Sequence, residues 1–121
     1  MAQLIGRALV EEQLLKLAPS VKDRFRVAYE RSEVGARRFS RLVKWKVEPR
    51  VHVSKNGHVT LRFIEIGVSM TALIFLDHNT VDYRASIERE GVEFAPYCQG
   101  IDLVTNALTI VKAFGVSVFT Q

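Results

Sequence analysis

The chain has 121 residues, of which 48% are hydrophobic and 25% are charged, so it can bury one core and is too apolar to be intrinsically disordered. No apolar run approaches the roughly 20 residues of a membrane-spanning helix, and acids follow too soon after Met1 for a signal peptide. The net charge of +4 favours polyanionic partners only modestly, and a single cysteine cannot form an internal disulfide. We therefore expect one domain over residues 1–121, located in the cytoplasm.

Two helices are expected in the N-terminal third. Apolar residues over 4–17 suit a first helix, which Pro19 ends. Ser20 and Asp23 have the spacing of a capping box, which would open a second helix. Apolar positions then recur at steps of three or four up to Val43, and the period continues through Gly35. We therefore predict one continuous second helix.

A β-hairpin is predicted around Gly57. Alternating valines precede the turn, and Val59 and Leu61 follow it. A three-residue loop with Gly57 in the left-handed conformation opposes Val53 to Val59 and Val51 to Leu61. A two-residue turn would instead put the two apolar sets on opposite faces. The loop therefore leaves one polar face, made of Arg50, His52, Ser54, His58, Thr60 and Arg62.

The remaining chain predicts three more strands and a helix. Residues 70–76 are apolar at almost every position, which is typical of a central strand covered on both faces. Residues 81–87 alternate as a half-exposed strand, and a short fifth strand is expected over 92–95. A last helix is expected from Ile101, with Asp102 in its first turn and Gly115 at its end. The expected fold is α+β in two layers: two N-terminal helices, an antiparallel meander of four to five strands and one C-terminal helix.

The second helix offers a candidate polyanion site. Arg24, Arg31 and Arg38 are spaced by seven, so they would form a row along one flank, which Arg41 and Lys44 extend. Such a row could contact phosphates. Two ion pairs at i, i+4 spacing, Arg26–Glu30 and Glu33–Arg37, would partly neutralise the positive charge of the same helix. An ordinary solvated helix is therefore the simpler interpretation.

The polar face of the hairpin is a second candidate for binding an anion. Arg50 and Arg62 would lie beside His52 and His58, and histidine titration would make such binding pH-dependent. An ordinary polar outer face explains the same residues. No carboxylate follows the histidines at a ligand-like spacing, so we expect no metal site.

No motif predicts catalysis. Cys98 would be a nucleophile only if a histidine and an acid approached it in the fold, and a small buried side chain is the simpler interpretation. We expect no enzymatic activity and no cofactor.

Apolar residues on two opposite strand faces suggest association. Ile64 and Ile66 lie on the face opposite Phe63, and in the next strand Leu73 and Phe75 lie on the face opposite Ala72 and Ile74. Two layers cannot easily hide both sets. Either helices cover each face, or a second copy or a protein partner covers one of them. These four residues, Ile64, Ile66, Leu73 and Phe75, are therefore the interface candidates.

Residues from Gly35 to Ile87 carry a resemblance to known proteins. The matching positions combine a helix end, a Trp and Pro before a strand, a Gly hairpin, an apolar strand and a Tyr strand, and they are Ala36, Phe39, Trp45, Pro49, Gly57, Leu61, Ile74 and Tyr83. This run resembles small uncharacterised bacterial α+β meander proteins that often belong to phages or other mobile elements. The sequence departs from them by Phe63, where Trp is common, and by a longer first helix. The resemblance implies the fold, no known activity, and by association a binding or inhibitory role.

The functional expectation is a non-enzymatic binding module. It would act as an adaptor or inhibitor, either as a homodimer or docked on a protein partner. The alternative is a nucleic-acid-binding domain that uses the basic flank of the second helix.

Overall fold

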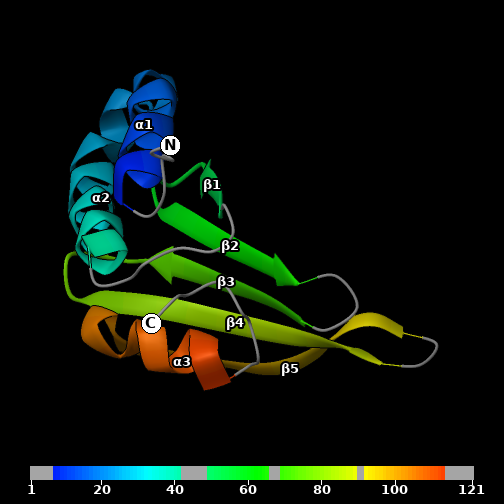
Figure 1. The fold of residues 1–121 in the computed structure, drawn as a ribbon. Coiled ribbons are helices and arrows are strands. Elements are labelled where there is room, and N and C mark those ends of the chain that lie inside the picture. The colour runs from blue at the N-terminus through cyan, green and yellow to red at the C-terminus, as the bar shows by residue number, and fades with distance from the viewer. Residues whose placement is uncertain (1–6, 42–48, 66–68, 90–91, 114–121) are drawn as a thin grey trace, which may run out of the picture.

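The computed structural model describes residues 7–41, 49–65, 69–89 and 92–113. Short 3₁₀ turns precede α2 and α3, at Ala18–Ser20, Asp23–Phe25 and Val104–Asn106. The main elements, in chain order, are α1 (Arg7–Leu17), α2 (Arg26–Arg41), β1 (Arg50–Val53), β2 (Val59–Glu65), β3 (Ser69–Phe75), β4 (Thr80–Arg89), β5 (Val92–Leu103) and α3 (Ala107–Ala113). The five strands form one antiparallel sheet in the order β1-β2-β3-β4-β5, which confirms the α+β meander (Figure 1).

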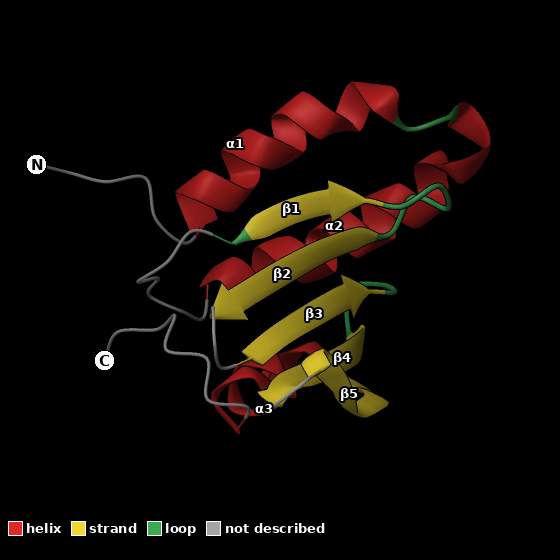
Figure 2. Cartoon of the chain, turned by 90° about the vertical axis from the view of Figure 1, so that its right-hand side faces the viewer, coloured by secondary structure: helices red, strands yellow, loops and turns green. Residues whose placement is uncertain are grey.

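All three α-helices pack on the same side of this sheet. Alternate residues of the strands, such as Leu61, Leu73 and Val81, are completely buried in one apolar cluster. The same cluster contains Leu14 from α1, Phe39 from α2 and Val111 from α3, so every helix contributes to the same interface (Figures 1 and 2). The structure therefore has two layers, and none of the described helices covers the other face of the sheet. The second cover that the sequence predicts for β3 is therefore not supplied by a described helix, and Ala72 and Ile74 are half-buried on that face.

Helix α2 is continuous through Gly35, as its period predicts. Its buried face includes Ser32, whose hydroxyl lies between the ends of two strands. Ser32 Oγ donates to the carbonyl of Phe75 at 2.5 Å and accepts from the N–H of Val59 at 2.6 Å. Since Val59 and Phe75 are register partners, this side chain ties the helix to both β2 and β3.

The β1–β2 hairpin has the predicted register. Val53 pairs with Val59 and Val51 with Leu61. Gly57 has a φ of 86°, in the left-handed region that glycine tolerates without strain. The alternation of the strands and the turn chemistry thus agree, so local sequence was sufficient here.

Two element boundaries differ from the prediction. The capping box is absent: Ser20 Oγ donates to the carbonyl of Leu17, and α2 begins at Arg26 after a separate 3₁₀ turn. The fifth strand extends to Leu103, so Ile101 and Asp102 are strand residues and α3 begins only at Ala107.

Asp102 Oδ1 accepts from Asn106 Nδ2 at 2.8 Å and from the N–H of Leu103 at 2.7 Å. These two hydrogen bonds hold the pKa of Asp102 below its usual range, and the bond from Asn106 contributes most.

Candidate binding surface on the open sheet face

The face of the sheet opposite the helices, called the open face here, presents side chains from all five strands. Its members are set by the strand registers, because alternate residues point to opposite faces. Two cross-strand rows make up its centre. They are Arg50, Arg62, Ala72, Arg84 and Gln99 in the first row, and His52, Thr60, Ile74, Asp82 and Ile101 in the second.

The first row brings together three arginines that are distant in sequence. Arg50 and Arg62 are direct partners on β1 and β2, and Arg84 lies on β4, beyond Ala72 of β3. All three are exposed. Since neighbouring strands are about 4.8 Å apart, the backbones of Arg62 and Arg84 are separated by about 10 Å, with the small Ala72 between them. We call Arg50, Arg62 and Arg84 the arginine row.

Most of the positive charge of the arginine row has no acidic partner among the described residues. Among the described residues, the one acid in the two rows is Asp82, whose Oδ2 accepts from Arg84 Nη2 at 3.3 Å. Asp82 Oδ1 is buried and has no hydrogen-bond partner in the described part of the chain. Arg50 and Arg62 stand directly opposite each other, and like charges in that position repel. The two described rows of the open face are therefore net positive.

Exposed apolar side chains lie on the same face beside the arginines. Ile101 is 67% exposed and Leu103 is 53% exposed, both near the end of β5. Ile74, the cross-strand partner of both Thr60 and Asp82, is half-buried. Two large aliphatic side chains therefore lie at the β5 edge of the open face, where Ile101 is diagonal to Arg84 across the β4–β5 pair.

The predicted residues of the sheet face are thus brought together. Arg50, His52 and Arg62 are exposed members of the open face, and Thr60 is buried between its neighbours. His58 is half-buried in the hairpin, where its N–H donates to Ser54 Oγ at 3.1 Å. Sequence reasoning did not include Arg84, Ile101 or Leu103. The alternation of residues 81–87 placed Arg84 on a polar face, but only the register shows that this face also carries Arg62.

The predicted row along α2 is assembled only in part, because Arg31, Arg38 and Arg41 lie on this helix and Arg24 does not. Arg24 lies outside α2, in the preceding 3₁₀ turn, with its guanidinium 4.8 Å from the centre of the Phe25 ring. Arg38 donates to Asn79 Oδ1 at 2.7 Å, which binds it to the β3–β4 turn. Arg31 and Arg41 are exposed, and Lys44 lies outside the described residues.

The two predicted ion pairs have different outcomes. Arg37 Nε lies 3.0 Å from Glu33 Oε1 as predicted, and its Nη1 also lies 3.3 Å from Glu11 Oε1 of α1. Arg26 does not pair with Glu30. It donates instead to two backbone carbonyls, Ala18 O at 3.0 Å and Val21 O at 2.9 Å.

The interface candidates are placed in three ways. Leu73 and Phe75 have no exposed surface, because they form the core beneath the helices. They are therefore not available to a partner, and the large apolar residues that are exposed on the described strands are Ile101 and Leu103 of β5. The backbone of Ile64 is in β2, and Ile66 lies outside the described residues.

Cys98 and His52 lie far apart on the described strands. Cys98 is half-buried on β5, whereas His52 is on β1 at the opposite end of the strand order. Within the described ranges, no group of three His, Cys, Asp or Glu side chains is placed to hold a metal ion.

Comparison with known protein families, curated proteins and solved structures found no match to this chain. The resemblance to bacterial meander proteins stays a prediction. In the part of the chain that the structure describes, no helix is long and apolar enough to cross a bilayer.

Proposed function

We propose that the protein is a non-enzymatic binding module that docks on an acidic protein partner through the open face of its sheet. The observation that carries this proposal is the arginine row beside the exposed side chains of Ile101 and Leu103. A partner with acidic groups next to apolar ones would complement both parts of this surface. It would act in the cytoplasm as an adaptor or inhibitor, and a single cysteine is compatible with a reducing compartment.

A protein partner is better supported than a second copy of the chain. A symmetric homodimer would bring two net-positive open faces together, and like charges in an interface are costly. Nucleic acid binding through the α2 flank is also less supported, since Arg24 lies outside α2 and Arg38 donates to Asn79. The open face carries no exposed aromatic ring among its described residues on which bases could stack.

Charge reversal on two surfaces tests the proposal. A lysate of native cells would be applied to three immobilised forms of the protein. These are the wild type, Arg62→Glu/Arg84→Glu, and the control Arg31→Glu/Arg41→Glu, which makes the same charge change on α2. We expect a protein partner to bind the wild type and the α2 variant. Its affinity for the open-face variant, measured by calorimetry with the purified partner, should fall roughly 100-fold.

A matched pair of apolar variants tests the other half of the surface. Ile101→Asp should lower the affinity for the same partner. Val27→Asp is the control and should not lower it, although Val27 on α2 is 63% exposed and Ile101 is 67% exposed. Loss of nucleic acid binding in the α2 variant would favour the alternative function. A chain that sediments as a monomer and retains no partner would overturn the proposal.

A further inference from the structure

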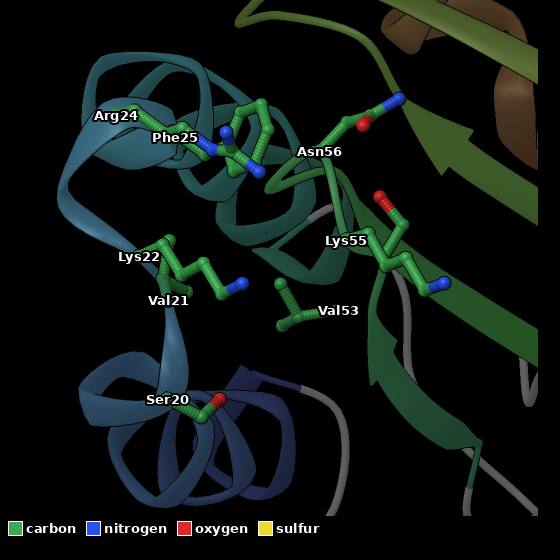
Figure 3. Close-up of a pocket in the computed structure, with 9 residues that line it drawn as sticks. Ser20, Val21, Lys22, Arg24, Phe25, Val53, Lys55 and Asn56 are labelled. Atoms are coloured by element: carbon green, nitrogen blue, oxygen red, sulfur yellow. The ribbon is translucent and has the colours of Figure 1, made fainter.

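A cavity separate from the open face lies between the start of α2 and the β1–β2 hairpin. Its volume is about 610 Å³, within the range of small-molecule sites. One wall is the segment 20–25, which links α1 to α2, and the other is the segment 53–56 of the hairpin (Figure 3). These segments are some 30 residues apart in sequence, so only the fold creates this cavity.

Both walls are held against the same helix. Arg26 at the start of α2 donates to the carbonyls of Ala18 and Val21, which fixes the linker wall. Gly57 fixes the hairpin wall by a close approach to that helix: a Cβ added there would lie 3.2 Å from the backbone nitrogen of Tyr29 and 2.8 Å from the carbonyl oxygen of Phe25, just before the helix. The cavity is therefore formed before any ligand binds, which lowers the entropic cost of binding.

The lining has an apolar floor. Val21 is 8% exposed, and Phe25 and Val53 are partly buried against the core. Figure 3 shows the Val53 side chain between the two walls, with the Lys22 amine extending toward it. A ligand in the cavity would therefore contact aliphatic and aromatic carbon in its deeper part.

The rim is cationic. Lys22, Arg24 and Lys55 line the cavity, no acid does, and none of the three forms an ion pair within the described ranges. Asp23 is their neighbour in the chain but is exposed and is not part of the lining. Arg24 is additionally oriented by its stacking on Phe25.

We propose that this cavity binds a small organic anion with an apolar body, such as a medium-chain or aromatic carboxylate. The anionic group would lie at the cationic rim, and the hydrocarbon would lie on the floor formed by Val21, Phe25 and Val53. Neither half would be sufficient, because the cationic side chains are exposed to solvent and the floor consists of three apolar residues only.

Three probes separate these contributions in a titration of ¹⁵N-labelled protein followed by NMR. Decanoate carries both features, decanol has the same chain without the charge, and inorganic phosphate has the charge without the chain. We expect decanoate to shift the amides of segments 20–25 and 53–57 in a saturable manner, with an affinity at least tenfold above that of either other probe.

Matched variants test the location. Lys22→Glu/Lys55→Glu should lower the affinity for decanoate at least tenfold, while Arg31→Glu/Arg41→Glu makes the same charge change on α2 and should leave it unchanged. Equal loss in both variants would show a nonspecific charge effect and overturn the proposal. Binding of an oligoglutamate peptide as tight as that of decanoate, or no saturable shift by decanoate, would also overturn it. The open-face proposal does not depend on either result.

Discussion

Gly35 shows how a single residue determines the distance between helix and sheet. From sequence, a glycine inside a helix costs about 1 kcal/mol relative to alanine, so it looks like a weak point. In the structure it is buried, and a Cβ at this position would overlap the carbonyl oxygen of Asp77 and lie 3.3 Å from Cδ1 of Phe75. The absent side chain is thus what allows α2 to approach the β3–β4 turn.

The two arguments predict opposite signs for Gly35→Ala. Helix propensity alone predicts a gain of about 1 kcal/mol in the free energy of unfolding, whereas overpacking predicts a net loss of about 1–3 kcal/mol. We expect the loss, measured by urea unfolding. An unchanged or higher stability would contradict the close packing seen here. Val34→Ala, at the neighbouring exposed position, is the control and should change little.

At the scale of elements, the β3–β4 turn connects three parts of the fold. Asp77 Oδ1 accepts from the N–H groups of Asn79 and Thr80, both at 2.8 Å. Asn79 in turn accepts from Arg38 of α2 through its side chain and from the N–H of Val104, ahead of α3, through its carbonyl. The turn therefore positions both helices on the sheet, and its geometry depends on one carboxylate.

This carboxylate predicts a pH dependence. The backbone N–H of Asn79, above all, lowers the pKa of Asp77 in the folded state. The folded chain thus binds this proton less readily than the unfolded chain, whose aspartate has a pKa of about 3.9. The stabilisation is fully present above that value and is lost as the pH falls through the lower folded pKa.

Asp77→Asn should remove this contribution. We expect urea midpoints of the variant to fall less steeply than those of the wild type between about pH 5 and pH 2.5. At neutral pH the variant should be the less stable protein, since its amide oxygen is a weaker acceptor. If the urea midpoints of the two proteins fell equally steeply at acidic pH, Asp77 would not contribute in this way.

At the scale of the whole molecule, one contiguous core joins α1 through α3 to the sheet. Two adjacent leucines of α1 show where that core ends: Leu14 has no exposed surface and Leu15 is 71% exposed. Because the cluster is continuous, the described elements should unfold together.

Leu14→Ala should lower the free energy of unfolding by about 2–5 kcal/mol, whereas Leu15→Ala should change it by less than about 0.5 kcal/mol. Urea unfolding of both variants should remain a single transition when circular dichroism and hydrogen exchange are compared. Loss of α1 at a lower urea concentration than the sheet would contradict a single cooperative core.

Local sequence predicted those parts of the fold that depend on neighbouring residues. The hairpin register followed from valine alternation and from Gly57, and the continuity of α2 followed from its helical period. The length of β5 did not follow from the local sequence. Pro96 and Gly100 interrupt any strand pattern there, yet the strand pairs along β4, with register shifts beside Ser86 and Ile87. The Tyr83 ring lies so close to Gly100 that a Cβ at this position would overlap it.

The sequence by itself determined the α+β class, the antiparallel order and which side chains of β1 and β2 share a face, because these depend on periodicity and turn chemistry. Only the tertiary structure decided which face the helices cover. That choice buried Leu73 and Phe75, left the arginine row exposed and engaged Arg38 with Asn79. It also created the cavity between two distant segments. The physical reason is that alternation sorts side chains into two sets, whereas long-range packing determines which set meets solvent.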